Sequence, residues 1–188
     1  MKKLLLAVLA VMSIAHLHAA NYQLQISPDD VFKVSDTAEW RFSVTRLQVM
    51  EIAEVTVTSK EDKNRFLLML YFMRDSGNYG QFNTPQKMEG AVRESGQKYA
   101  SCSVEKTVNI ENIDIKGSYG FKALFTDAEL AKQKDKIPEG QFLYLFRGMI
   151  RLSDDTALGF RFCTNDLNSA ETKKIEKYIL SFVKNARP

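Results

Sequence analysis

Two stretches of the chain are apolar at nearly every position, while most other apolar residues alternate with polar ones. The first stretch, Arg65 to Met73, places phenylalanine and leucine on one face and leucine, methionine and tyrosine on the other. The second, Gln141 to Leu152, has a similar pattern and is rich in aromatic residues. A strand that is apolar on both faces must be covered on both sides. The sequence therefore predicts two interior strands, in a sheet that carries a layer above and below it.

Alternation of apolar and polar residues, or enrichment in Val and Thr, predicts the remaining strands. These strands are Tyr22 to Ile26, Trp40 to Val44, Ile52 to Thr58, Ser101 to Val108, Ile110 to Lys116, Gly120 to Thr126 and Ala157 to Thr164. Asp154-Asp155 is the predicted hairpin turn before the last of them. Asp127 to Gly140 is the longest polar loop, and a loop of this length is often either functional or mobile.

Cap residues and helical spacing of apolar residues predict three helices. Pro28 to Val34 begins with Pro and Asp residues, which favours a short helix. Thr84 caps a second helix that ends at Gly96. The C-terminal helix, capped by Ser169, has three lysines on one side, and only Leu180 fits neither of its faces. Its other side is an apolar stripe at helical spacing, made of Ile175, Tyr178, Ile179, Phe182 and Val183.

Helices of this kind can supply the layers that the interior strands need. The predicted fold class is therefore α+β, with an antiparallel sheet covered by helices on both faces, an α/β/α sandwich. No low-complexity stretch or extended linker divides the chain, and an apolar content of 45% supplies ample core material. We expect residues 21–188 to form a single globular domain.

Residues 1–20 have the organisation of a secretory signal peptide. Two lysines follow the first methionine, and Leu4 to Met12 is an uninterrupted apolar run. The favoured cut follows Ala19 or Ala20, and a cut after Ala15 is the alternative. Nine apolar residues are too few to span a bilayer. We therefore expect a periplasmic or secreted protein with no transmembrane anchor after cleavage.

Cleavage changes the charge of the chain and its histidine content. Loss of the two N-terminal lysines leaves 24 basic residues against 23 acidic ones, a net charge of +1. A domain so close to neutral has no electrostatic footprint for nucleic acid, so no nucleic-acid partner is expected. His16 and His18 are the only histidines, and the favoured cut removes both, which excludes imidazole catalysis and His-ligated zinc. A cut after Ala15 would instead leave a histidine-rich N-terminus that could chelate copper.

Cys102 and Cys163 are the only cysteines. An oxidising compartment and an even count favour a disulfide between them. Both lie in predicted strands, so the bond would join two parts of one core and contribute roughly 4 kcal/mol on the chain-entropy model. The alternative is a pair of buried, unbonded thiols that act as small apolar side chains.

No motif identifies a catalytic, cofactor-binding or metal-binding residue, and none of these is expected. Ser95 to Lys98 and Ser103 to Lys106 match Ser-x-x-Lys, but neither serine opens a predicted helix, as that motif requires. Gly77 to Gly80 and Gly117 to Gly120 lack the lysine of a phosphate loop. Carboxylate-based hydrolysis stays open, because 23 acidic residues offer many pairs and none stands out.

The last third of the chain has a distinctive order of elements. An aromatic strand over Phe142 to Leu152 leads through Asp154-Asp155 to a second strand over Leu158 to Phe162, and then to a helix ending Ile179-Leu180-Ser181-Phe182. This order resembles the end of PsbP-like domains and of the related DcrB-type periplasmic proteins. The resemblance implies an α/β/α sandwich around an antiparallel sheet. It also implies a protein that binds or assists others rather than catalysing a reaction.

The leading functional hypothesis is a non-catalytic periplasmic or secreted binding or accessory protein, whose partner is a protein or a small apolar ligand. One alternative is a histidine-free hydrolase that uses carboxylates, and another is an inhibitor or chaperone-like factor. An exposed aromatic surface would favour the binding protein. Two carboxylates facing each other across an open cleft would favour the hydrolase.

Overall fold

The computed structural model describes residues 21–26, 31–47, 52–62, 64–75, 77, 79–133 and 136–185. The predicted signal peptide, with both histidines and every candidate cleavage position, lies outside the described residues.

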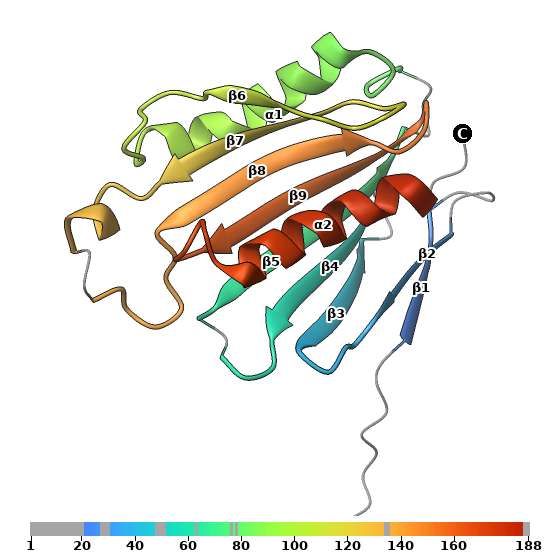
Figure 1. Cartoon of the computed structure of the whole chain (residues 1–188). Helices are drawn as coiled ribbons and strands as arrows, with labels where there is room; N and C mark the ends of the chain where they lie inside the picture. Colours follow the sequence, from blue (N-terminus) through green and yellow to red (C-terminus); the bar gives the residue numbers. More distant parts are fainter. Residues whose placement is uncertain are drawn as a thin grey trace, which may run out of the picture.

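In the described part of the chain, seven strands form one antiparallel sheet in the order β3-β4-β5-β9-β8-β7-β6 (Figure 1). Their bounds are β3 (Trp40–Leu47), β4 (Ile52–Ser59), β5 (Phe66–Arg74), β6 (Ile110–Ile113), β7 (Gly120–Thr126), β8 (Tyr144–Arg151) and β9 (Thr156–Thr164). The first three strands, β3, β4 and β5, form one half of the sheet. After a helix, β6 forms the far edge, and β7, β8 and β9 follow it in order, so that β9 pairs with β5. The two strands that are apolar on both faces, β5 and β8, are therefore interior, as the sequence predicts.

The N-terminal residues form a separate two-stranded antiparallel sheet from β1 (Asn21–Gln25) and β2 (Val31–Ser35). The predicted helix over Pro28 to Val34 is wrong. In β2, buried Phe32 and Val34 alternate with exposed residues, and this period of two belongs to a strand. The Pro and Asp residues that favoured a helix lie outside the described residues, in the connection between the two strands.

Helix α1 (Pro85–Ala100) starts as predicted but ends later. The side chain of Thr84 accepts a hydrogen bond from the backbone N–H of Lys87, which caps the first turn. The predicted end at Gly96 is wrong, because the helix continues to Ala100. Gly96 is buried, and a Cβ there would lie 3.0 Å from the ring of Phe125 in β7. This glycine lets the helix pack closely on the sheet.

Helix α1 packs against β6, β7 and β8. Its buried side chains Met88 and Val92 share a cluster with Phe121 of β7 and Met149 of β8. Helix α2 (Ala170–Asn185) begins after Ser169, whose hydroxyl accepts a hydrogen bond from the N–H of Thr172 at 3.0 Å, so the predicted cap is confirmed.

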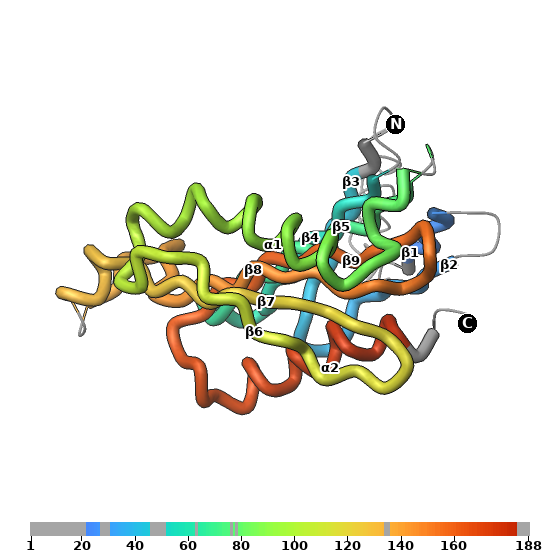
Figure 2. Tube along the Cα trace, turned by 90° about the horizontal axis from the view of Figure 1, so that it is seen from above, coloured from blue at the N-terminus to red at the C-terminus, as the bar shows by residue number. Residues whose placement is uncertain are grey.

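Helix α2 makes its ring contacts with β2, β3 and β5. Tyr178 lies edge-on to Trp40 at 5.4 Å between ring centroids, and Phe182 lies edge-on to Phe72 at 5.2 Å. Phe182 also approaches Phe32 of β2 at 6.1 Å, so the small sheet joins the same core. Viewed from above, α1 and α2 lie on opposite sides of the sheet and over different strands (Figure 2).

The connections differ from the sequence prediction at one place. The predicted strand Ser101 to Val108 is wrong, because this segment consists of turns, with a single bridge between Ser103 and Asp127. The turn at Asp154-Asp155 is confirmed, since it joins β8 to β9. The polar loop contains a short 3-10 helix, Leu130–Gln133.

Candidate ligand-binding pocket

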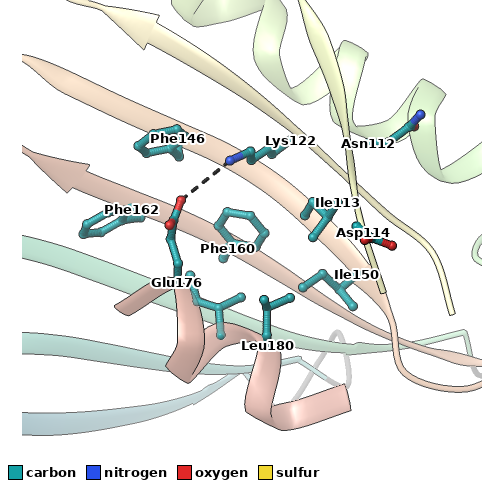
Figure 3. A pocket seen from close by; sticks show the side chains of 11 residues that line it. Asn112, Ile113, Asp114, Lys122, Phe146, Ile150, Phe160, Phe162, Glu176 and Leu180 are labelled. Carbon is teal, nitrogen blue, oxygen red and sulfur yellow. Dashed lines mark ion pairs between the residues drawn. The ribbon is translucent and has the colours of Figure 1, made fainter. Parts of the chain in front are cut away.

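A pocket of about 230 Å³ lies between helix α2 and strands β6, β7, β8 and β9. It lies beside α2, with α1 behind the sheet (Figure 3). Its floor is aromatic and consists of Phe146, Phe160 and Phe162. Ile113 of β6 and Leu180 of α2 contribute apolar surface at its sides. The pocket is therefore a largely apolar cavity between the sheet and α2.

The floor follows from the register of β8 and β9. Phe146 and Phe162 are direct partners across the two strands, and their rings stack at 5.8 Å with an interplanar angle of 8°. The next partner pair on this face is Gly148 and Phe160. A Cβ at Gly148 would collide with the Phe160 ring. The glycine thus makes room for the third ring of the floor.

An ion pair connects the sheet and the helix beside this floor (Figure 3). The ammonium of Lys122 in β7 lies 3.6 Å from a carboxylate oxygen of Glu176 in α2, and 3.9 Å from a carboxylate oxygen of Glu111. The same ammonium lies 5.2 Å from the centroid of the Phe146 ring. Partly exposed pairs of this kind contribute little stability, typically below about 1 kcal/mol. The pair can therefore open at small cost.

Two carboxyl groups line the pocket. Glu176 and Asp114 line it, and Figure 3 shows them on opposite sides with the Phe160 ring between them. Glu176 already faces Lys122. General acid and base chemistry on a glycoside needs two carboxyl groups that flank one bond. The arrangement instead suits binding, with an apolar floor and a few polar groups at the edge.

The two cysteines lie in different environments. Cys163 is buried in β9 as expected, and burial raises the pKa of its thiol to about 11. Cys102 is exposed in the turn that follows α1, and its thiol lies 3.2 Å from the carbonyl oxygen of Tyr99. The expectation that Cys102 lies in a strand is therefore wrong. Both are free thiols in the structure, and the disulfide stays a prediction for the exported protein.

The pocket was not identified from the sequence, although one residue signalled it. Leu180 lies outside both the apolar stripe and the lysine side of its helix. In the structure it is half-buried and lines the pocket. A lone apolar residue between the two faces of an amphipathic helix points along the sheet surface beside the helix.

The chain matches no protein-family model, no curated protein and no solved structure. Its resemblance to the end of PsbP-like domains stays a prediction. In the described ranges, neither helix has the length and apolar character needed to cross a membrane. Among the side chains of those ranges, no three His, Cys, Asp or Glu residues come together as metal ligands.

Proposed function

We propose that this chain is an exported, non-catalytic binding protein that takes a small apolar ligand into the pocket between α2 and strands β6 to β9. The observation that carries the proposal is a pocket beside α2 whose floor consists of three phenylalanine rings. Pockets for drug-sized ligands usually measure about 300 Å³ or more. A cavity of about 230 Å³ suits a smaller molecule, such as one aromatic ring system or a short alkyl chain.

The proposal includes an α/β/α sandwich whose two helices are offset. Helix α1 packs against β6–β8 on one side. The ring contacts of α2 are with β2, β3 and β5 on the other side. This offset leaves the β6–β8 half of the α2 side without a helix. The ligand would cover that half of the sheet face in place of a helix.

Export is the second part of the proposal, and it rests on the sequence. Residues 1–20 have a basic start, an apolar run and small residues before the favoured cut. The mature protein, residues 21–188, would then work in the periplasm or outside the cell.

Titration of the mature chain with the neutral fluorescent probe 1-naphthylamine, which has a single aromatic ring system, tests this function. We expect a saturable rise in fluorescence with a stoichiometry of one. Leu180→Phe adds bulk inside the pocket and should weaken probe binding roughly tenfold or more, the loss of about 1.4 kcal/mol. Val104→Phe is the matched control, because Val104 is 55% exposed and distant from the pocket lining.

Two results would overturn the proposed pocket function. The first is fluorescence that rises linearly without saturation. The second is equal probe affinity in the wild type and in Leu180→Phe. A mature chain that captures an apolar protein segment but excludes the small probe would assign the pocket to a protein partner instead.

A further inference from the structure

Two arginines lie side by side on the sheet face that carries α1. Arg147 in β8 and Arg161 in β9 are direct partners across the two strands, so both side chains project on the same side. Helix α1 reaches them through Ser95 and Tyr99. The adjacent strand β5 contributes Tyr71, whose ring centroid lies 5.4 Å from the guanidinium carbon of Arg147. The pair therefore lies at the edge of the area that α1 covers.

The contacts of both guanidinium groups are with uncharged atoms. In Arg147, Nε donates to the hydroxyl of Ser95 at 3.2 Å, and Nη1 points to the carbonyl oxygen of Phe160 at 3.5 Å. In Arg161, Nη1 lies 3.5 Å from the hydroxyl of Tyr99, and Nη2 contacts the sulfur of Met69. The Nε of Arg161 is buried and has no hydrogen-bond partner among the described residues. Hydroxyl, carbonyl and sulfur atoms are weak acceptors for guanidinium groups that are about half buried.

Other arginines of the chain do have acidic partners. Arg74 pairs with Asp155 at 3.2 Å, Arg93 pairs with Glu89 at 2.8 Å, and Arg151 pairs with Asp154. Within the described ranges, neither Arg147 nor Arg161 forms an ion pair with a carboxylate. Burial lowers the pKa of Arg147, and the neighbouring charge of Arg161 contributes to the lowering. The pKa of Arg161 is raised instead, because the effect of its own burial is outweighed by its contact with Tyr99 together with other neighbouring side chains. Two adjacent cations without an anion are unfavourable, and an anion placed between them would offset the repulsion.

We propose that Arg147 and Arg161 form a binding site for an oxyanion, namely the carboxylate or phosphate group of a ligand. Guanidinium groups present planar forks of N–H donors that match carboxylate and phosphate oxygens. The hydroxyl of Tyr99 lies 3.5 Å from Arg161, and the hydroxyl of Tyr71 donates to the same Met69 sulfur that Arg161 contacts. This site is separate from the aromatic pocket, because it lies on the opposite face of the sheet and involves other residues.

The test is an NMR titration of the mature chain that follows the Nε–H signals of its arginines. Inorganic phosphate and acetate are added separately, with chloride keeping the ionic strength constant. We expect the signals of Arg147 and Arg161 to shift along one saturating curve. Saturation with phosphate alone identifies a phosphate ligand, and saturation with acetate alone identifies a carboxylate. Saturation with both supports a general oxyanion site.

Substitution of each arginine tests whether the anion binds at Arg147 and Arg161. Arg147→Gln and Arg161→Gln should each raise the dissociation constant at least about tenfold, the effect of losing one charged hydrogen bond. Arg93→Gln is the matched control, since it removes an arginine that already has a carboxylate partner, and it should leave the dissociation constant unchanged. Where a glutamine variant does not fold, the wild-type titration decides, because it needs no substitution. The proposal fails if the signals of Arg147 and Arg161 do not saturate with either anion, or if both glutamine variants bind as the wild type does.

Discussion

At the scale of single residues, the two cysteines differ in how easily water and reagents reach them. Cys102 is exposed in a turn, whereas the side chain of Cys163 lies inside β9 with its residue only 7% exposed. Desolvation raises the pKa of the Cys163 thiol to about 11. At pH 8 only roughly a thousandth of that thiol would be thiolate, the form that reacts.

We therefore expect iodoacetamide at pH 8 to modify Cys102 and to leave Cys163 unmodified in the reduced, folded protein. Mass spectrometry after short exposure measures the modification at each site, and unfolding in guanidinium should make both react. Rapid modification of Cys163 in the folded protein would contradict the buried thiol. The same measurement without reductant tests the disulfide, because a bonded pair would leave neither thiol to react. Such a bond would require the two Cα atoms to approach within about 7 Å.

At the scale of elements, periodicity predicted most of the strands. A period of two, or apolar residues on both faces, is a property of one segment and needs no knowledge of its neighbours. The strand from Gly120 to Thr126 therefore has the predicted bounds. The strand from Phe66 to Arg74 is interior, as its two apolar faces require. Both helix caps, Thr84 and Ser169, were also predicted from local chemistry.

The elements that were missed depend on tertiary contacts. Gly96 has the sequence signature of a helix end, but in the structure it is the point where α1 touches β7. Val31 to Ser35 forms a strand because Phe32 and Val34 reach the core that contains Phe72 and Phe182. A signal read along the chain cannot identify which distant residues will be available for packing.

The same dependence on packing makes Gly148 of β8 a sharp test of the pocket floor. A Cβ at this position would collide with the Phe160 ring and lie 2.8 Å from the carbonyl oxygen of Phe121. We expect Gly148→Ala to lower the free energy of unfolding by about 1–3 kcal/mol, the usual cost of overpacking. It should also change the affinity for the neutral probe, because the displaced ring belongs to the floor. Urea unfolding curves measure the first effect.

Gly90→Ala is the control for Gly148→Ala. A Cβ at Gly90 of α1 would have nothing within 4 Å. Alanine should therefore stabilise the helix by up to about 1 kcal/mol. If Gly148→Ala were as stable as Gly90→Ala, the close contact between β8 and the Phe160 ring would be refuted.

At the scale of the whole molecule, the pocket arises from the offset between the helices and the sheet. The sequence predicts that both faces of the sheet are covered, but its pattern does not indicate which strands each helix packs on. That choice depends on where α2 docks, and α2 docks through Tyr178 and Phe182 onto β3 and β5. In the proposed offset arrangement, the position of the aromatic floor beside α2 follows from this docking.

Trp40 reports on that docking because it is the single tryptophan of the chain. It is buried, its ring lies 5.8 Å from Phe66 of β5 and 5.4 Å from Tyr178 of α2, and its indole N–H donates to the carboxylate of Glu171 at 2.5 Å. Since helix, sheet and tryptophan share one core, we expect urea unfolding followed by Trp40 fluorescence and by far-UV circular dichroism to give the same midpoint.

Phe182→Ala extends this test to the core that joins α2, β5 and the small N-terminal sheet. Phe182 is buried and contacts the rings of Phe72, Phe32 and Tyr178. Its truncation should cost about 3 kcal/mol or more and move both midpoints together. A fluorescence midpoint at clearly lower urea than the dichroism midpoint would mean that α2 leaves the sheet as a separate step. In that case the boundary of the pocket would be mobile, because Leu180 and Glu176 move with the helix.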